Sequence, residues 1–125
     1  MFDNVLVAVD GSEGSSLASQ YAVHLAQRMG SKVTLIHVVE QPPLPFYTAG
    51  VSEQERERFV EAVRESGRVI LRMDQRPFAE ADVSVDLQLV EGRPADVICK
   101  FADDEQFDVI IVGNRGRGAV RRALL

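Results

Sequence analysis

The feature that most constrains this chain is a repeated alternation between strongly apolar runs and stretches with helical spacing. The runs at residues 4–10, 32–39 and 107–113 are rich in valine, isoleucine and leucine and lack regular polar alternation, which is typical of strands covered on both faces. Residues 83–90 alternate with period two, which predicts a strand at the sheet edge with one solvated face. Strands separated by helices form βαβ units, so we predict an α/β fold built on an open, doubly wound parallel sheet.

Capping signals locate the first two helices. Ser12 precedes a stretch with helical spacing, and Gly30 is suited to end that helix. Residues 40–50 contain three prolines, which excludes regular strand pairing and predicts a loop. Ser52 and Glu55 then form a capping-box pair, so a second helix is predicted to begin near Ser52.

Prolines mark the later helix boundaries. Pro77 removes a backbone donor, and we expect the second helix to end or kink within residues 76–81. Pro94 suits the first position of a third helix, whose apolar stripe faces the sheet. Cys99 lies beside that stripe and is predicted to be a buried, inert thiol. From Arg117 onward we predict a fourth helix.

Composition and charge exclude several classes of protein. Of the 125 residues, 46% are hydrophobic and 26% are charged, so we expect one globular domain spanning residues 1–125. The net charge of −5 argues against nucleic acid as a partner. The apolar runs are far shorter than the ~20 residues of a membrane span, and the first residues lack the pattern of a signal peptide. We therefore expect no membrane association and a cytoplasmic location.

Ligands of a doubly wound sheet bind at the carboxyl ends of the strands, where the strand order reverses. The loop at residues 113–118 reads Gly-Asn-Arg-Gly-Arg-Gly and directly follows a predicted strand. Its glycines let backbone N–H groups approach an anion, and Arg115 and Arg117 add positive charge, so phosphate is the expected ligand. From these residues alone, a loop whose arginines are merely solvated is as well supported as a phosphate site. The spacing matches neither the P-loop nor the dinucleotide-binding fingerprint, which disfavours both of those classes.

Other candidate residues carry less information. Asp10, at the end of the first strand, can hold a ribose hydroxyl, a base edge or a metal. The alternative, about as well supported, is that Asp10-Gly11-Ser12 only forms a turn and a helix cap. His24 and His37 lack the neighbours of a catalytic triad or a metal cluster, so both are interpreted as structural. We predict no catalytic and no metal-ligating residue.

Four motifs, in this order, resemble those of the universal stress protein family. They are Val7-Ala8-Val9-Asp10-Gly11-Ser12, Leu35-Ile36-His37-Val38-Val39, Gly92-x-Pro94-Ala95 and Asp108-Val109-Ile110-Ile111-Val112-Gly113-Asn114-Arg115-Gly116, and together they span essentially the whole chain. The resemblance implies a Rossmann-like fold of the adenine nucleotide alpha hydrolase-like type. It also implies parallel strands in the order 3-2-1-4-5, with nucleotide held at the carboxyl ends of strands one and four.

The resemblance also implies an element that this sequence lacks. Family members that bind ATP carry G-x2-G-x9-G-[ST] after the fourth strand, and here Gly113-x2-Gly116 is followed by the nine residues that end at Leu125. We therefore expect the Gly-[Ser/Thr] element and the fifth strand to be absent, as in a C-terminally truncated copy of a longer protein.

Carried over by position, the resemblance assigns nine residues to the nucleotide. Residues of the first strand line the base and ribose, a valine of the second meets adenine, and the fourth strand with its glycine loop borders ribose and phosphates. The nine are Ala8, Val9, Asp10, Val38, Val112, Gly113, Asn114, Arg115 and Gly116.

The expected function is that of an ATP-binding regulatory protein in a stress response, with ATP bound alone or with Mg²⁺. One alternative is a weak Mg-dependent ATPase or nucleotidyl-transfer enzyme, in which Asp10 or Glu13 holds the metal. Another is a family member that does not bind nucleotide. A phosphoacceptor receiver domain needs an aspartate after the third strand, and Val90-Glu91-Gly92 lacks one. The resemblance further implies a homodimer of the full-length protein, paired at the fifth-strand edge.

Overall fold

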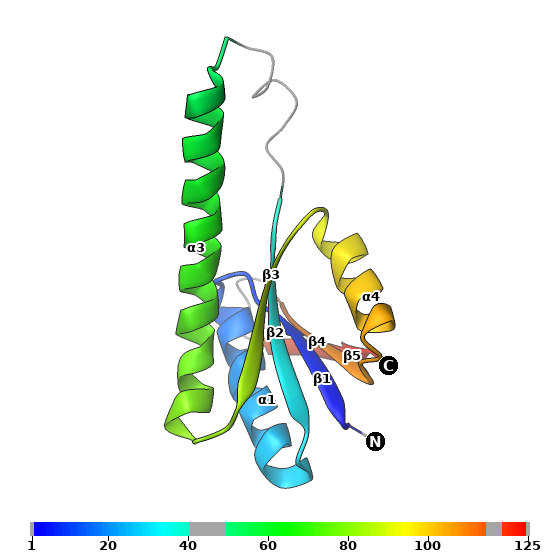
Figure 1. The fold of residues 1–125 in the computed structure, drawn as a ribbon. Helices are drawn as coiled ribbons and strands as arrows, with labels where there is room; N and C mark the ends of the chain where they lie inside the picture. Colours follow the sequence, from blue (N-terminus) through cyan, green and yellow to red (C-terminus); the bar gives the residue numbers. More distant parts are fainter. Residues whose placement is uncertain (1, 41–49, 115–118, 125) are drawn as a thin grey trace.

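The computed structural model describes residues 2–40, 50–114 and 119–124, with Asn114 and residues 119–124 described by their backbone alone. Figure 1 shows a twisted sheet with helices on both faces. In chain order the elements are β1 (Asn4–Ala8), α1 (Glu13–Met29), β2 (Lys32–Val39), α3 (Glu53–Glu80), β3 (Val85–Glu91), α4 (Pro94–Asp104), β4 (Val109–Asn114) and β5 (Ala119–Leu124).

The strands form one sheet in the order β3-β2-β1-β4-β5. β1 pairs in parallel with both of its neighbours, so Val7 lies opposite Leu35 on one side and Ile111 on the other. β2 and β3 are also parallel. The predicted α/β fold, with a parallel sheet of order 3-2-1-4, is therefore confirmed.

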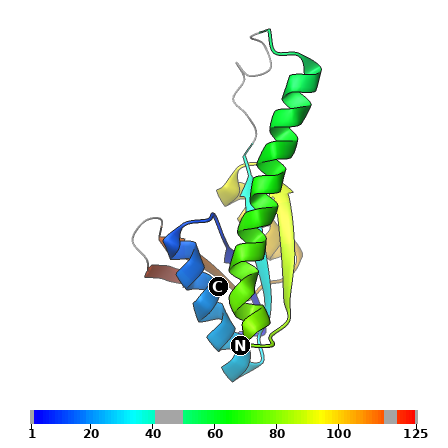
Figure 2. The ribbon, with the colours of Figure 1, turned by 90° about the vertical axis from the view of Figure 1, so that its left-hand side faces the viewer.

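Separate apolar cores pack against the two faces of the sheet. On one face α1 and α3 lie side by side (Figures 1 and 2) and bury a core that includes Val7, Leu35 and Phe78. On the other face (Figure 1) α4 packs through Ala102 against a smaller core that includes Leu6. The central strands β1 and β2 contribute to both cores, which explains why their sequences are apolar without alternation.

The edge position predicted for residues 83–90 is confirmed. β3 is the outermost strand beside β2, and its side chains alternate between half-buried and exposed. Leu87 and Leu89 pack against the α1–α3 core, whereas Asp86 and Gln88 are exposed. One face of this strand is therefore solvated, as its period-two sequence predicts.

The predicted helix caps are present. The Ser12 side chain accepts a hydrogen bond from the backbone N–H of Ser15 at 3.2 Å, and Gly30 ends α1 with φ of 68°. At the start of α3, Ser52 and Glu55 each accept a hydrogen bond from the other's backbone N–H, at 3.1 Å in both directions. Both helix starts therefore follow from local sequence.

α3 is longer than the sheet is deep, and its N-terminal half extends past the ends of the strands (Figures 1 and 2). The helix contains Pro77 in its last turn and ends at Glu80, within the predicted region. Residues 41–49, which fall in the predicted loop, lie outside the described residues. None of the described helices is both long enough and apolar enough to cross a membrane.

The C-terminal segment corrects the expectation of a helix from Arg117 onward and adds a strand that differs from the parallel fifth strand of the family. The Ala119–Leu124 segment forms β5, which pairs antiparallel with β4 so that Ile111 lies opposite Ala123. Only residues 115–118 separate the two strands, whereas parallel pairing needs a crossover of about a dozen residues or more. With so short a connection β5 can pair with β4 only in the antiparallel direction, unlike the parallel fifth strand implied by the resemblance.

The burial predicted for Cys99 is also wrong, because this thiol is exposed. The buried side of α4 is formed by Ala102, with Val97, Ile98 and Phe101 packed around it. Each helical residue rotates the side-chain direction by about 100°, so a neighbour in sequence need not share the apolar stripe.

Candidate functional site

A cavity of about 260 Å³ opens at the carboxyl ends of β1, β2 and β4. The chain leaves β1 toward β2 through α1, and it later crosses from β3 to β4 on the other side of β1 through α4. The strand order reverses at this point, which is where open α/β sheets form a crevice. The lining residues are Ala8, Val9, Asp10, Ser15, Ile36, His37, Val38, Pro94, Ile98, Val112 and Gly113.

Six of the nine residues assigned to the nucleotide border this one cavity, although they come from three separate strands or their ends. They are Ala8, Val9, Asp10, Val38, Val112 and Gly113. Asn114 is the last residue of β4, next to Gly113. Arg115 and Gly116 lie outside the described residues.

Five further lining residues were not assigned to the site from the sequence: Ser15, Ile36, His37, Pro94 and Ile98. Two of these five residues could have been identified from the sequence. Ile36 lies two residues before Val38 on the same strand and therefore on the same face, and Pro94 belongs to a motif that resembles the family. Ser15 and Ile98 enter the cavity only because α1 and α4 pack where they do.

One side of the cavity is apolar. Its lining includes Ile36 and Val38 of β2, Pro94 and Ile98 of α4, and Val112 of β4, and Ile36, Val38 and Ile98 belong to the core between the sheet and α4. A wall of aliphatic side chains with a few polar groups at one end is the usual composition of a small-molecule site. This side can bury a flat, largely apolar ring.

Asp10 supplies a carboxylate at the polar end of the cavity. Its Oδ1 accepts a hydrogen bond from the backbone N–H of Ser12 at 2.9 Å, which is the turn chemistry considered as an alternative from the sequence. A carboxylate offers about four acceptor positions. The turn and a ligand-binding role are therefore compatible for the same side chain.

Gly113 brings β4 into direct contact with the first turn of α1. A Cβ atom at this position would lie 2.2 Å from the carbonyl carbon and oxygen of Gly14, and 2.5 Å from the backbone nitrogen of Ser15. Only a residue without a side chain fits between strand and helix here. Gly113 thus has a packing role in addition to the phosphate contact implied by the resemblance.

His37 is held by the fold, in agreement with its structural interpretation. Its Nδ1 lies 2.8 Å from the carbonyl oxygen of Val9, and because a carbonyl only accepts, Nδ1 carries the proton that is donated. On α3, Gly67 leaves room for the ring, since a Cβ there would lie 2.9 Å from His37 Cδ2. The imidazole therefore fixes the end of β1 beside the cavity.

Asp74, on α3, was not singled out from the sequence. This aspartate is only 7% exposed, and its Oδ2 accepts a hydrogen bond from the cavity-lining Ser15 hydroxyl at 3.4 Å. Burial raises the pKa of Asp74, the Ser15 hydrogen bond lowers it, and the charge of Asp10 raises it again. Nothing local in the sequence marks this residue, because its partner is 59 positions away.

Asp10 is the one acidic residue among the described residues that line the cavity. In the part of the chain that the structure describes, no group of three or more histidine, cysteine, aspartate or glutamate side chains is arranged to hold a metal ion. Glu13, which the enzyme alternative pairs with Asp10, is the first residue of α1 and is not among the lining residues.

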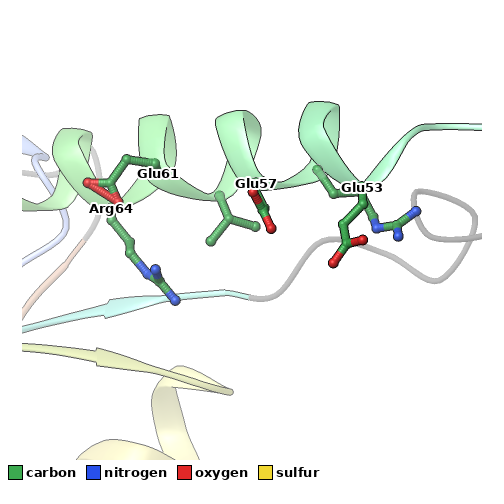
Figure 3. Close-up of a pocket in the computed structure, with 6 residues that line it drawn as sticks. Glu53, Glu57, Glu61 and Arg64 are labelled. Carbon is green, nitrogen blue, oxygen red and sulfur yellow. The ribbon is translucent and has the colours of Figure 1, made fainter.

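A larger hollow, of about 480 Å³, follows the overhanging half of α3 (Figure 3). Its described lining comes from one face of that helix, with the labelled Glu53, Glu57, Glu61 and Arg64 in a row. Arg64 already pairs with Glu91 at 2.6 Å. A single charged helix face with paired side chains is typical of a solvated surface, so the sheet-end cavity is the better candidate site.

Comparison with known proteins gives a consistent result. The model of the universal stress protein family matches residues 1–125. A universal stress protein of Methanocaldococcus jannaschii is 27% identical over 125 residues, which cover 100% of this chain and 72% of the relative. A universal stress protein of Thermus aquaticus is 31% identical over 124 residues, which cover 96% of this chain and 82% of the relative.

Solved structures share the fold. A universal stress protein family member from Burkholderia pseudomallei has a TM-score of 0.75 at 27% identity, covering 90% of this chain and 82% of its own. A member from Arabidopsis thaliana with AMP bound has a TM-score of 0.68 at 22% identity, covering 94% and 80%. A universal stress protein in complex with cAMP has a TM-score of 0.58 at 22% identity, covering 86% and 69%.

Proposed function

The chain belongs to the universal stress protein family, and from this membership we propose that it binds an adenine nucleotide in the cavity at the ends of β1, β2 and β4. The observation that carries the proposal is that Ala8, Asp10, Val38 and Gly113, from separate parts of the chain, border one cavity. The AMP and cAMP complexes of proteins with the same fold support the same ligand class.

The cavity suits the nucleoside part of such a ligand. Its volume of about 260 Å³ lies just below the ~300–1,000 Å³ of sites that enclose a drug-sized molecule. The apolar side formed by Ile36, Val38 and Ile98 can receive the purine, and the Asp10 carboxylate can accept a ribose hydroxyl. The phosphates then extend past Gly113 toward the Gly/Arg segment, where Asn114, Arg115 and Gly116 are proposed contacts.

We propose ATP as the nucleotide, with or without Mg²⁺, and a regulatory role in a stress response. Binding requires only the cavity, whereas catalysis on a phosphate needs a base or a metal beside the attacking group. The described cavity lining offers one carboxylate, Asp10, and a histidine whose Nδ1 is engaged with Val9. This set favours nucleotide binding over a dedicated enzymatic activity.

We also propose that the protein forms a homodimer and acts in the cytoplasm. An outer strand such as β5 offers unpaired backbone groups to a second copy. Sedimentation analysis at high micromolar concentration tests the dimer, and a monomer there would contradict it. The single cysteine is compatible with a reducing compartment.

The nucleotide proposal is tested by titrating ATP, AMP and cAMP into the protein and into two matched variants. Ala8→Leu adds volume to the cavity wall, and Ala95→Leu makes the same change at an exposed position of α4. We expect ATP affinity to fall at least ~10-fold in Ala8→Leu, a loss of about 1.4 kcal/mol, and to be unchanged in Ala95→Leu. Absence of nucleotide binding by the parent, or equal affinity in all three proteins, would contradict the proposal.

A further inference from the structure

The buried carboxyl of Asp74 has no role in the nucleotide site as described so far. It lies on α3 against the first turn of α1 and is 7% exposed. Its hydrogen-bond partner is the Ser15 hydroxyl. Among the described titratable groups, the one whose charge acts on Asp74 is another carboxylate, Asp10, located on the segment between β1 and α1.

The Ser15 hydroxyl connects Asp74 to the first turn of α1. The Ser15 hydroxyl lies 3.1 Å from the carbonyl oxygen of Ser12 and 3.4 Å from Asp74 Oδ2, but it has one proton to donate. If Asp74 is ionised, Ser15 donates to it, and the Ser12 carbonyl keeps its hydrogen bond from the Ser16 backbone N–H at 3.1 Å. If Asp74 is protonated, it can donate to Ser15 Oγ while Ser15 donates to Ser12. Ser15 therefore accommodates both forms of Asp74, and burial at 7% exposure favours the neutral one.

Ser15 and Asp10 both line the cavity, so Asp74 is one side chain removed from any ligand there. The charge of Asp10 already raises the pKa of Asp74. A phosphate held near the polar end of the cavity adds negative charge on the same side, and like charges favour the neutral form of a carboxyl group. The effect of the ligand therefore has the same sign as that of Asp10.

We propose that Asp74 is a positioning residue that links ligand charge to a proton: a phosphate-bearing nucleotide binds the cavity together with a proton on Asp74, whereas an uncharged nucleoside binds without one. The inference rests on the nucleotide-binding function proposed above and adds a mode of regulation to the same site. By linkage, ATP affinity falls as pH rises through the pKa of Asp74, and falling pH strengthens binding.

The experiment is calorimetric titration of ATP, and separately of adenosine, across about pH 5 to 8 in pairs of buffers that differ in ionisation enthalpy. The dependence of the heat on the buffer gives the number of protons taken up. The parent is compared with Asp74→Asn, which mimics the neutral carboxyl, and with Asp86→Asn, which removes an exposed aspartate of β3. Protonation of the ATP phosphates occurs in all three proteins and is the common baseline of the comparison.

We expect the parent and Asp86→Asn to take up a larger fraction of a proton with ATP than Asp74→Asn does, and the difference to vanish with adenosine. At the upper end of the pH range, Asp74→Asn should bind ATP severalfold more tightly than the parent. At the lower end the two affinities should converge.

Three results would overturn the inference. Proton uptake with ATP that is equal in the parent and Asp74→Asn would remove Asp74 from the linkage while leaving nucleotide binding intact. An Asp74→Asn variant that fails to fold would show that the neutral form does not fit the site. A parent protein that binds no ATP at any pH would overturn the proposed function and this inference together, and the missing heat of binding distinguishes that case from the first.

Discussion

At the scale of single residues, the site depends on two glycines, because a Cβ atom at either position would clash with a neighbouring element. Gly113 lets β4 touch the backbone of Gly14, and Gly67 leaves room for the His37 ring that is hydrogen-bonded to Val9. Both glycines are needed because two elements approach closely, and neither has the positive φ that usually explains a glycine.

We predict that Gly113→Ala is strongly destabilising. The added Cβ would lie 2.2 Å from the Gly14 carbonyl group, and rigid backbone must move to relieve the clash, at a cost of about 1–3 kcal/mol or more. Urea unfolding measures the loss. Gly50→Ala is the comparison, because its Cβ meets nothing within 4 Å and its φ of +73° alone causes strain, of about 1–2 kcal/mol. A Gly113→Ala protein as stable as the parent would show that α1 and β4 do not pack as described.

At the scale of elements, the two halves of α3 are supported unequally by the rest of the molecule. Its C-terminal half packs on the sheet through Leu71 and Phe78, while its N-terminal half extends beyond the strands (Figure 1). The overhanging half is stabilised by local interactions, including the Ser52–Glu55 capping box and the pairing of Arg68 with Glu61 and Glu65. Exposed ion pairs contribute little, so the cap should dominate.

We predict that Ser52→Ala frays the first turns of α3. The change removes the acceptor for the backbone N–H of Glu55 and should cost about 1 kcal/mol. Hydrogen exchange should quicken at residues 53–58 while the sheet amides keep their protection. Ser66→Ala, at an exposed position inside the same helix, should be neutral or slightly stabilising because alanine has the higher helix propensity. Equal exchange in both variants would mean that the cap does not hold the overhang.

At the scale of the whole molecule, the free energy of unfolding should depend on pH because of the buried Asp74. Its pKa is raised in the folded protein above the usual value of 3.8, so the folded state binds the proton more tightly than the unfolded chain. The free energy of unfolding therefore decreases as pH rises from about 3.8 through the raised pKa, and the penalty is constant above it.

We predict that Asp74→Asn removes this penalty. Above the raised pKa the variant should be more stable than the parent by about 1–3 kcal/mol, the usual cost of a poorly satisfied buried polar group. Near the lower end of the window the two proteins should converge. Chemical denaturation over a pH series measures the difference, with Asp86→Asn as the exposed control. A variant less stable than the parent at neutral pH would mean that the ionised carboxyl is the form that stabilises the fold.

Local sequence was sufficient for most of the elements. Ser12 and Ser52 begin α1 and α3, Gly30 ends α1, and Pro94 begins α4, because caps act within one helical turn. The apolar runs place β1, β2 and β4 in the covered centre of the sheet, and the alternation in β3 places it at the edge. The strand order came from the family resemblance, and the general rule for open parallel sheets placed the ligand site at the carboxyl ends of the strands.

The amino-acid pattern thus predicted the fold class and the residues at the carboxyl ends of the strands, because periodicity and caps are local properties. The sheet order through β4 was predicted from the resemblance of four motifs to the family. Only the tertiary structure decided the direction of β5, the exposure of Cys99, and the approach of Ser15 and Asp74 to the cavity. Each of these depends on which surfaces meet between segments distant in sequence. No local pattern records those contacts, because they exist only when the helices have packed on the sheet.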